Sequence, residues 1–448
     1  MHASFARRSL FPRGFGLIAA SSSLVLVLAA CSASSKNNGF GGGGSDSGTT
    51  AAVVSASASV TTGSGQGGDI GFDGGPAGTG AGGMAPTCTP GGPDDDVDND
   101  GFTPKQGDCD DCDPFSNPNS LEVIATDGST PKDENCNGVI DEVTPAVTCD
   151  QGIDVADLDP MMVPKAVELC KISSGPKDWG VVSAKWVLAD GSPPPAAALV
   201  NFHLGHGFLT TFGANIKVRA GARMLGLSSG TARDPNDPGY QNVQGFSKGY
   251  SGNSPAGFPK ESPACPGSVT GEPNDPTGVE VTVRVPSNAH GFSFDFDFFT
   301  FEWPGFICST FNDFFVAILS PVPMGQTDGN ISFDSVGNPV SVNNAFLEVC
   351  GCAGNPPNPC LAGGKTFSCA LGDTDLIATG FGFDSGGGDH GSTGWLQTTA
   401  PVDPGKQITL RWAVYDSGDG ALDTTTLIDN WRWLATPGIT VGTNPVPK

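Results

Sequence analysis

The chain has 448 residues, enough for two or three domains, and it is rich in glycine (65 residues) and proline (37). This composition favours loops and β-structure over long helices. The formal net charge of −25 argues against a nucleic-acid partner, because phosphates select lysine and arginine. It suits divalent cations instead.

Residues 1–30 predict a lipoprotein signal peptide. Arg7, Arg8 and Arg13 form a basic region, and the apolar stretch that follows is too short for a confident transmembrane span. It ends in Leu28-Ala29-Ala30-Cys31, which resembles a bacterial lipobox and implies that Cys31 receives lipid after cleavage. The alternative is an ordinary secretory signal with a chance cysteine. We therefore expect an exported protein, anchored through the lipid on Cys31 to the outer membrane or cell surface.

Residues 31–87 are predicted to be a flexible linker. Stretches such as GFGGGGSDSGTT and GSGQGGDIGFDGGPAGTGAGG lack the apolar residues that a core needs. The linker would hold the folded part away from the lipid surface.

The cysteine count agrees with export. Thirteen cysteines minus Cys31 leave twelve, and an even number in an oxidising compartment predicts disulfides. Zinc binding by the CxxC pair at 109–112 is a rival, but its aspartate-rich setting favours a hard cation with oxygen ligands. The simplest hypothesis is pairing within four groups, whose internal connectivity stays open: Cys88, Cys109, Cys112 and Cys136; Cys149 and Cys170; Cys265 and Cys308; Cys350, Cys352, Cys360 and Cys369.

Residues 88–145 form an acidic segment that predicts calcium binding. Asp96-x-Asp98-x-Asp100-Gly101 matches the first half of an EF-hand-type loop, in which alternating carboxylates converge on one cation and glycine permits the turn. The loop then departs from that pattern, because Gly107 stands where glutamate is usual. The alternative is a solvated acidic run, which would lack glycines at fixed offsets and interspersed cysteines.

A second half-loop, Asp133-x-Asn135-x-Asn137-Gly138, carries neutral ligands and predicts a weaker site. Ile140 stands where such loops place a buried aliphatic residue. The candidate calcium ligands of the whole segment are Asp96, Asp98, Asp100, Asp108, Asp110, Asp111, Asp133, Asn135, Asn137 and Asp141.

The stretch DVDNDGFTPKQGDCDDCDP…DENCNGVIDE resembles the metal-binding motif of bacterial surface and secreted proteins of the methanotroph MopE type. The resemblance covers about fifty residues of this chain and implies calcium more than it implies catalysis.

Residues 146–178 are predicted to be a short helical connector. Met161, Met162, Val163 and Ala166 would lie on the helix, with Pro164 near its start. Cys149 and Cys170 would staple it, and no chemistry is expected there.

Residues 179–440 predict a two-sheet, jelly-roll-like β-sandwich, followed by a tail at 441–448. The stretches at 279–285 and 408–414 alternate apolar and polar residues, and glycine- and proline-rich turns separate them. In FSFDFDFFTFEW the alternation slips after Phe298. We expect a β-bulge at 298–299, and burial of Phe292, Phe294, Phe296, Phe299 and Phe301.

Three stretches of this domain, FSFDFDFFTFEWPGFICSTFNDFFVAIL, GNPVSVNNAFLEVC and WAVYDSGDGALDTTTLIDNWRW, resemble the choice-of-anchor L domain of extracellular proteins. The resemblance covers most of 200–436 and implies a cell-surface β-domain without a named reaction.

A tentative second metal site lies within this domain. Its candidate ligands are found at turns that flank strands, where a sandwich could gather them round one calcium. The alternative is that Asp-Gly turns simply cap hairpins. The candidates are Glu302, Asn312, Asp313, Asp416, Asp419 and Asp423.

Catalytic motifs are weak. The G-x-S-x-G match at 226–230 needs a following helix, which Pro235 and Pro238 oppose. His203 and His206 would face opposite sides of a strand, which disfavours a zinc pair. An acidic pair such as Glu302 and Asp297 is expected by chance in so acidic a protein.

The leading hypothesis is a lipid-anchored, calcium-binding surface protein with a non-catalytic sandwich for adhesion. Its partner would be a surface protein, a polysaccharide or a matrix ligand. The alternative is a carbohydrate-binding module or surface hydrolase. Trp395, Trp431 and Trp433 would then form an exposed aromatic platform, although core packing is the commoner role for such residues.

Overall fold

The computed structural model describes residues 88–126, 129–142, 148–268, 270–343, 346–351, 360–382 and 390–446, which belong to one compact unit. The predicted signal peptide, Cys31, the linker at 31–87 and Cys352 lie outside these residues. Within the described ranges, no helix combines the length and the apolar character needed to cross a membrane.

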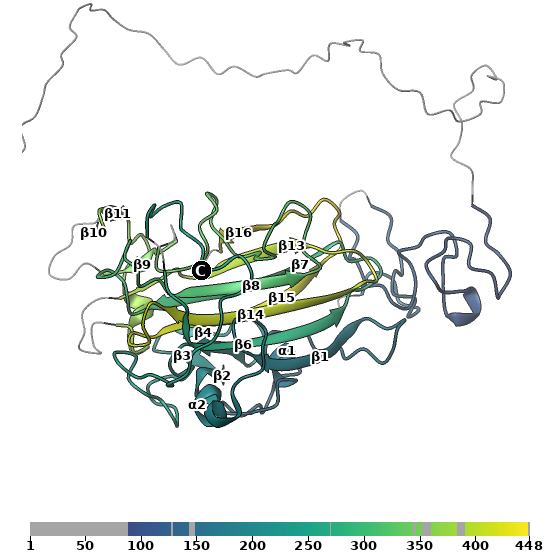
Figure 1. Cartoon of the computed structure of the whole chain (residues 1–448). Coiled ribbons are helices and arrows are strands. Elements are labelled where there is room, and N and C mark those ends of the chain that lie inside the picture. The colour runs from purple at the N-terminus through teal and green to yellow at the C-terminus, as the bar shows by residue number, and fades with distance from the viewer. Residues whose placement is uncertain are drawn as a thin grey trace, which may run out of the picture. The chain divides into compact units, whose positions relative to one another are not determined.

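Two antiparallel sheets form the body of the molecule (Figure 1). Sheet A has the strand order β1 (Gly180–Val187), β6 (Pro273–Arg284), β14 (Gln407–Ser417) and β8 (Phe314–Ser320). Sheet B has the order β16 (Gly442–Pro445), β13 (Leu396–Pro401), β7 (Gly291–Thr300), β15 (Thr424–Leu434), β5 (Met224–Ser228) and β2 (His206–Leu209). Beside β7, β12 (Gly391–Ser392) pairs with both β7 and β9 (Val349–Cys350).

The remaining elements are short. They are the strand pairs β3 (Thr211–Phe212) with β4 (Ile216–Lys217) and β10 (Cys360–Ala362) with β11 (Lys365–Phe367), the helices α1 (Met162–Ala166) and α2 (Leu199–Phe202), and the 3-10 turns η1 (Pro104–Gln106), η2 (Ala196–Ala198), η3 (His203–Gly205) and η4 (Thr374–Leu376).

The main core lies between the two sheets, as the alternating sequences predict. Trp412 of β14 meets Phe294 of β7 edge to face, with ring centroids 5.4 Å apart. Phe296 of β7 packs against Phe315 of β8 at 4.8 Å. Each such ring contributes about 1.5–3 kcal/mol through burial. The predicted β-sandwich is therefore confirmed.

The bulge predicted at Phe298–Phe299 is wrong. Along β7 and β15, Phe298 faces Thr426 and Phe299 faces Thr425 in continuous register. The alternation does not slip, because both faces of sheet B are covered at this end. Phe298 joins the core between the sheets, whereas Phe299 and Phe301 join a second apolar cluster on the outer face. The predicted burial of these phenylalanines is correct.

The ladder between β7 and β15 does have an irregularity, but it lies on the partner strand between Asp429 and Arg432. Asn430 adopts a positive φ of 58° there. Asparagine tolerates this conformation better than most residues.

The sandwich also extends past its predicted end at 440. β16 pairs with β13, and the hydroxyl groups of Thr443 and Thr398 lie 2.8 Å apart. The strand is short and polar, so its sequence carries no alternating apolar pattern that would predict it.

Five disulfides link described residues, and all lie within the predicted groups. They are Cys88–Cys112, Cys109–Cys136, Cys149–Cys170, Cys265–Cys308 and Cys350–Cys369. Cys109 and Cys112 belong to different disulfides, so this CxxC pair offers no thiolates to zinc. The disulfide predicted between Cys149 and Cys170 closes the connector that carries α1.

The connector is part of the main core. Val163 and Ala166 of α1 are fully buried, and they join the cluster between the sheets. The backbone N–H of Trp431 donates to the carbonyl of Val167 at 2.9 Å. The short helix therefore packs against the sandwich as well as linking two regions.

The acidic segment docks on the loop between β6 and β7. Asn288 accepts from the backbone N–H of Leu121 and donates to its carbonyl, both at 2.8 Å. The N–H of Ser287 donates to the carbonyl of Asn119 at 3.0 Å. These contacts join a loop-rich segment to a rigid sheet.

Candidate metal centre

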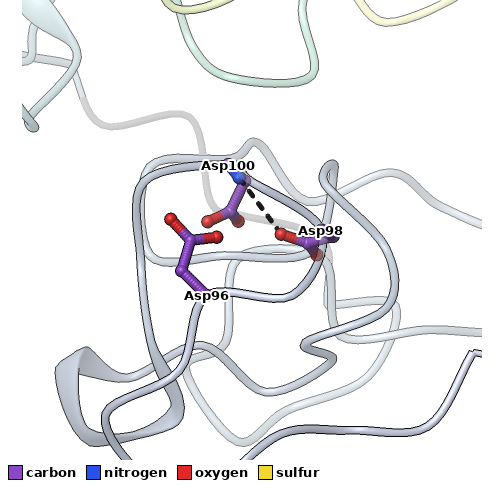
Figure 2. A group of neighbouring side chains, drawn as sticks. All are labelled: Asp96, Asp98 and Asp100. Atoms are coloured by element: carbon purple, nitrogen blue, oxygen red, sulfur yellow. Dashed lines mark hydrogen bonds between the residues drawn. The ribbon is translucent and has the colours of Figure 1, made fainter.

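Three aspartates of the first half-loop point toward one another (Figure 2). Asp96, Asp98 and Asp100 each offer a carboxylate oxygen, and these oxygens all lie within 4.8 Å of one another. Within the described ranges, no other three acidic, histidine or cysteine side chains reach this proximity.

Local hydrogen bonds hold the three carboxylates in place. The N–H of Asp100 donates to Asp98 Oδ1 at 3.1 Å, and the N–H of Phe102 donates to Asp100 Oδ1 at 2.6 Å. The N–H of Gly101 reaches back to Asp96 Oδ2 at 3.1 Å. Gly101 has a φ of 95°, which a residue without Cβ adopts readily. The D-x-D-x-D-G spacing therefore produces the turn expected from the sequence.

Each of these aspartates uses one oxygen for the backbone and leaves the other without a hydrogen-bond partner. The same holds for Asp108, whose Oδ1 accepts from the N–H of Asp110 at 2.9 Å. The buried oxygens without a partner are Asp96 Oδ1, Asp98 Oδ2, Asp100 Oδ2 and Asp108 Oδ2. Buried unpaired carboxylate oxygens are costly. A cation among Asp96, Asp98 and Asp100 would offset that cost, whereas Asp108 lies outside this group of three.

The electrostatics point the same way. Burial raises the pKa of Asp98 and of Asp108, and neighbouring carboxylates raise both pKa values further. Burial, together with the charges of Asp98 and Asp108, raises the pKa of Asp100 to about 6. Like charges this close disfavour ionisation. A bound cation would reverse that effect, so these residues fit a metal.

Two other predicted ligands have different roles. Asp111 is buried, and its two oxygens accept from the N–H groups of Gly91 (2.6 Å) and Val97 (3.0 Å). Asp111 therefore fixes the backbone at the start of the loop and has no unbonded oxygen left for a metal. Asp110 is exposed, and the structure does not bring its carboxylate into the three-aspartate group.

The second half-loop does not gather its predicted ligands. Both oxygens of Asp133 accept backbone N–H groups, from Asn137 at 3.1 Å and from Gly138 at 2.8 Å. Asn135 and Asn137 turn their amide nitrogens to Glu142 Oε1. Asp141 Oδ1 accepts from the N–H of Ala125 at 3.0 Å.

Ile140 is 60% exposed, so the expectation that it is buried was wrong. The first described helix after Ile140 is α1, which begins only at Met162, so this half-loop is not followed directly by the helix of an EF-hand.

The sequence analysis did not identify two glutamates that lie at this second half-loop. Glu122 Oε2 and Glu142 Oε2 are buried and have no hydrogen-bond partner. Glu122 Oε1 accepts from the N–H of Asp141 at 2.7 Å. Glu142 follows the half-loop directly, whereas Glu122 lies on a separate stretch of chain, and loop spacing gives no signal for it.

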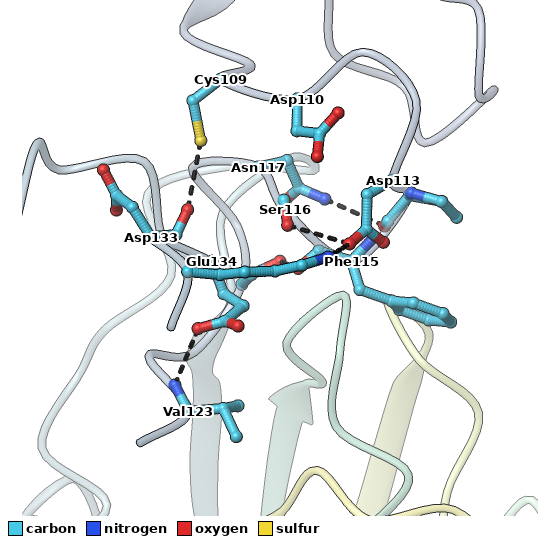
Figure 3. A network of polar contacts seen from close by, with 12 residues as sticks. Cys109, Asp110, Asp113, Phe115, Ser116, Asn117, Val123, Asp133 and Glu134 are labelled. Atoms are coloured by element: carbon cyan, nitrogen blue, oxygen red, sulfur yellow. Dashed lines mark hydrogen bonds and ion pairs between the residues drawn. The ribbon is translucent and has the colours of Figure 1, made fainter. Parts of the chain in front are cut away.

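The second half-loop is joined to the stretch of chain that follows the first half-loop (Figure 3). Besides the Cys109–Cys136 disulfide, Glu134 Oε2 accepts from the N–H of Val123 at 3.2 Å. Lys132 bonds to Asp113 at 2.5 Å.

The structure buries most of the candidate ligands of the second site. Five of its six candidates, namely Glu302, Asn312, Asp313, Asp416 and Asp423, are buried, whereas Asp419 is exposed. Asn312 Oδ1 accepts from the N–H of Asn343 at 3.1 Å and so has a structural role.

The weak catalytic motifs have structural roles. Ser228 is the buried last residue of β5, and its hydroxyl donates to the carbonyl of Thr424 at 3.0 Å. The next regular element is the strand β6 rather than a helix, so the G-x-S-x-G match is not a nucleophile elbow. Glu302 and Asp297 are both buried, and Asp297 Oδ1 accepts from the hydroxyl of Ser392 at 2.5 Å.

The histidine prediction was wrong in its geometry. His203 Nδ1 and His206 Nε2 lie 2.7 Å apart. They face each other because His203 lies on the 3-10 turn η3 and only His206 lies on β2. Residues three apart meet on such a turn.

The aromatic platform of the alternative function is not formed by the predicted residues. Trp395 and Trp431 are 8% and 5% exposed. Trp433 is partly buried and packs against the main core.

No protein-family model, curated protein or solved structure matches this chain.

Proposed function

We propose that this protein is a lipid-anchored, calcium-binding protein of the cell surface, whose β-sandwich serves adhesion or another surface interaction. The observation that supports it best is the set of four buried carboxylate oxygens without partners at Asp96, Asp98, Asp100 and Asp108.

Calcium fits this donor set better than other common cations. The group consists of carboxylates on flexible loops, and calcium accepts six to eight oxygens in irregular geometry. Magnesium demands a tight octahedron and dehydrates reluctantly. Zinc prefers nitrogen and sulfur ligands, and Cys109 and Cys112 beside the group are disulfide-bonded.

Calcium binding is expected to order the whole segment. The residue after the turn, Phe102, is buried, and the ammonium group of Lys177 lies 5.0 Å from its ring centre. Lys177 also donates to the carbonyl of Gly101. Ligands that converge only in the folded loop couple metal binding to folding. The cation would thus fix the loop against the connector.

Calorimetry on the mature chain, with its disulfides intact, tests the calcium site. We expect calcium to bind with heat, and magnesium to substitute poorly. Asp100→Ala should remove most of the first-site heat. Asp94→Ala is the matched control, because Asp94 is exposed and pairs with Lys105. Equal heats in both variants would exclude the proposed site.

The anchor rests on the lipobox-like sequence at Cys31. Formation of five disulfides between described residues suits an oxidising compartment outside the cytoplasm. Cys31→Ser should abolish metabolic lipid labelling and membrane retention. Unchanged labelling in membrane fractions would contradict the anchor.

The adhesive role rests on the sandwich and on its resemblance to the choice-of-anchor L domain. A screen of glycans and cell surfaces, with and without calcium, would identify the partner. Binding to a surface component without turnover supports adhesion. Bond cleavage in a bound glycan would instead favour a hydrolase.

A further inference from the structure

Two carboxylates lie buried at the end of the sandwich where β14 is followed by β15. Asp416 is near the end of β14 in sheet A, and Asp423 directly precedes β15 in sheet B. Their side chains are 1% and 0% exposed. All four of their oxygens are buried, and none has a partner in good hydrogen-bond geometry. The Ser229 hydroxyl and the Asp313 carboxyl are near enough to Asp416 to influence the pKa values there. Ionised groups are rarely buried in this way without a counter-charge.

Other acidic groups surround this pair. Asp313 is buried, but it is partnered, since its Oδ1 accepts from the N–H of Ser417 at 3.2 Å and its Oδ2 accepts from the Thr424 hydroxyl. Glu302 is buried, and its Oε2 has no partner. Burial, with the charges of Asp313 and Asp423, raises the pKa of Asp416 well above its ordinary value. The group therefore contains more negative charge than it can hold unaided.

A single buried lysine lies nearby among the described residues, and its ammonium group is hydrogen-bonded to other acceptors. Lys248 is 1% exposed. Its ammonium donates to the carbonyl of Ser228 at 2.9 Å and to the hydroxyl of Thr277. Neither acceptor is a carboxylate. The positive charge lowers the pKa of Asp423, yet burial dominates and leaves that pKa raised.

The backbone makes room for the Asp423 carboxylate. A Cβ on Gly230 would lie 1.8 Å from Asp423 Oδ2, so no larger residue fits at 230 without displacing this oxygen. The N–H of Gly230 donates to the Ser228 hydroxyl instead of to the carboxylate. Gly230, the last glycine of the G-x-S-x-G sequence, thus leaves space for Asp423 Oδ2, which accepts no hydrogen bond from the protein.

We propose that Asp416 and Asp423 bind one divalent cation, calcium, at the end of the sandwich, with the Glu302 carboxyl close by. Within the described ranges, three converging carboxylates occur only at Asp96, Asp98 and Asp100. The buried site would therefore use two carboxylates and complete its shell with neutral oxygens. Oxygen donors without histidine or cysteine suit calcium.

The cation would act as a clamp between the sheets. Asp416 belongs to sheet A, and Asp423 leads into sheet B, with the exposed residues 418–419 in the loop between them. A shared ligand would hold this end of the sandwich closed. The proposal does not depend on the site at Asp96.

The test uses the full mature chain with the acidic segment disabled by Asp98→Ala, Asp100→Ala and Asp133→Ala. Thermal unfolding of the sandwich is followed in millimolar calcium and in chelator. We expect the unfolding midpoint to rise by several degrees in calcium in this background. Adding Asp416→Asn and Asp423→Asn should abolish that rise. Asp419→Asn is the matched control, an exposed acid of the same loop, and should preserve it.

Native mass spectrometry provides a second measurement that does not need the Asn variants to fold. The disabled background should retain one bound calcium. Absence of both bound calcium and a shift of the midpoint would overturn the proposal. So would a calcium-dependent rise that survives both Asn substitutions. Stability that rises on acidification without any response to calcium would show that these carboxyls are protonated instead.

Discussion

The acidic segment and the sandwich are stabilised by different forces. In the sandwich, aromatic and branched side chains of two sheets interdigitate, as Phe294 and Trp412 do. Among the described residues of the segment at 88–142, Phe102 is the one buried hydrophobic side chain. The segment is held instead by disulfides, by hydrogen bonds from backbone N–H groups to aspartate side chains, and by contacts with the sandwich. The sandwich should therefore be stable without the first calcium site, whereas the segment depends on its cross-links and, under our proposal, on a cation.

The largest effect should come from the core of the sandwich. Phe294→Ala removes a fully buried ring and should cost about 3–5 kcal/mol. The loss should be equal in calcium and in chelator, because this core contains no metal ligand. Chemical denaturation measures it, and Leu361→Ala, at a side chain 78% exposed, should change little. If the loss of unfolding free energy depended strongly on calcium, the proposed difference between the two regions would be contradicted.

Next in size is the disulfide that ties the half-loops. Replacing Cys109 and Cys136 by serine should destabilise the acidic segment by about 2–4 kcal/mol, because the open chain gains entropy. The sandwich should keep its unfolding midpoint. Limited proteolysis with mapped cleavage sites separates the two responses. Removing Cys265–Cys308 in the sandwich is the matched control, and it should leave cleavage within 88–142 unchanged.

Docking should contribute less. Asn288→Ala removes two hydrogen bonds to the backbone of Leu121 and should cost the docked state about 1–3 kcal/mol. Faster hydrogen exchange near Leu121, with unchanged exchange in β7, is the expected result. Asn253→Ala, at an exposed side chain, serves as the control. If exchange near Leu121 were unaffected, the segment would be held by other contacts.

The smallest effect concerns pH and the connector. Burial and the charge of Asp150 raise the pKa of Glu168 to about 7. A raised folded-state pKa means that the contribution of this group to stability is complete below its ordinary value near 4.5. That contribution is lost as the pH rises through 7. Glu168→Gln should flatten this part of the pH dependence of the unfolding free energy. An unchanged slope would show that Glu168 does not titrate in this range.

Sequence patterns predicted the sandwich well where one physical rule dominates. The alternation at 279–285 and 408–414 follows from one face packing on the core. The same kind of alternation gave a wrong prediction at Phe299. A second apolar cluster packs on the other face of β7 there, and the periodicity of one strand cannot reveal a cluster formed by distant residues. His203 was misplaced for a related reason, since a strand was assumed where a 3-10 turn forms.

The local geometry of the candidate metal centre was predictable from the sequence. D-x-D-x-D-G fixes the turn and three carboxylates by near-neighbour geometry. Which later aspartates join them depends on backbone N–H groups distant in sequence, such as those of Gly91 and Val97 that occupy Asp111. Glu122 was missed for the same reason, because it reaches the second half-loop from a separate stretch of chain.

The central claim is that calcium orders the acidic segment and that the sandwich does not depend on that first site. Hydrogen exchange on the full mature chain, with and without calcium, tests it most directly. We expect calcium to slow exchange strongly across residues 96–108, by roughly a hundredfold at one hundred times the dissociation constant. Exchange in β7 and β13 should change far less, and Asp100→Ala should abolish the protection at 96–108. Equal exchange in this loop with calcium and with chelator would contradict the account.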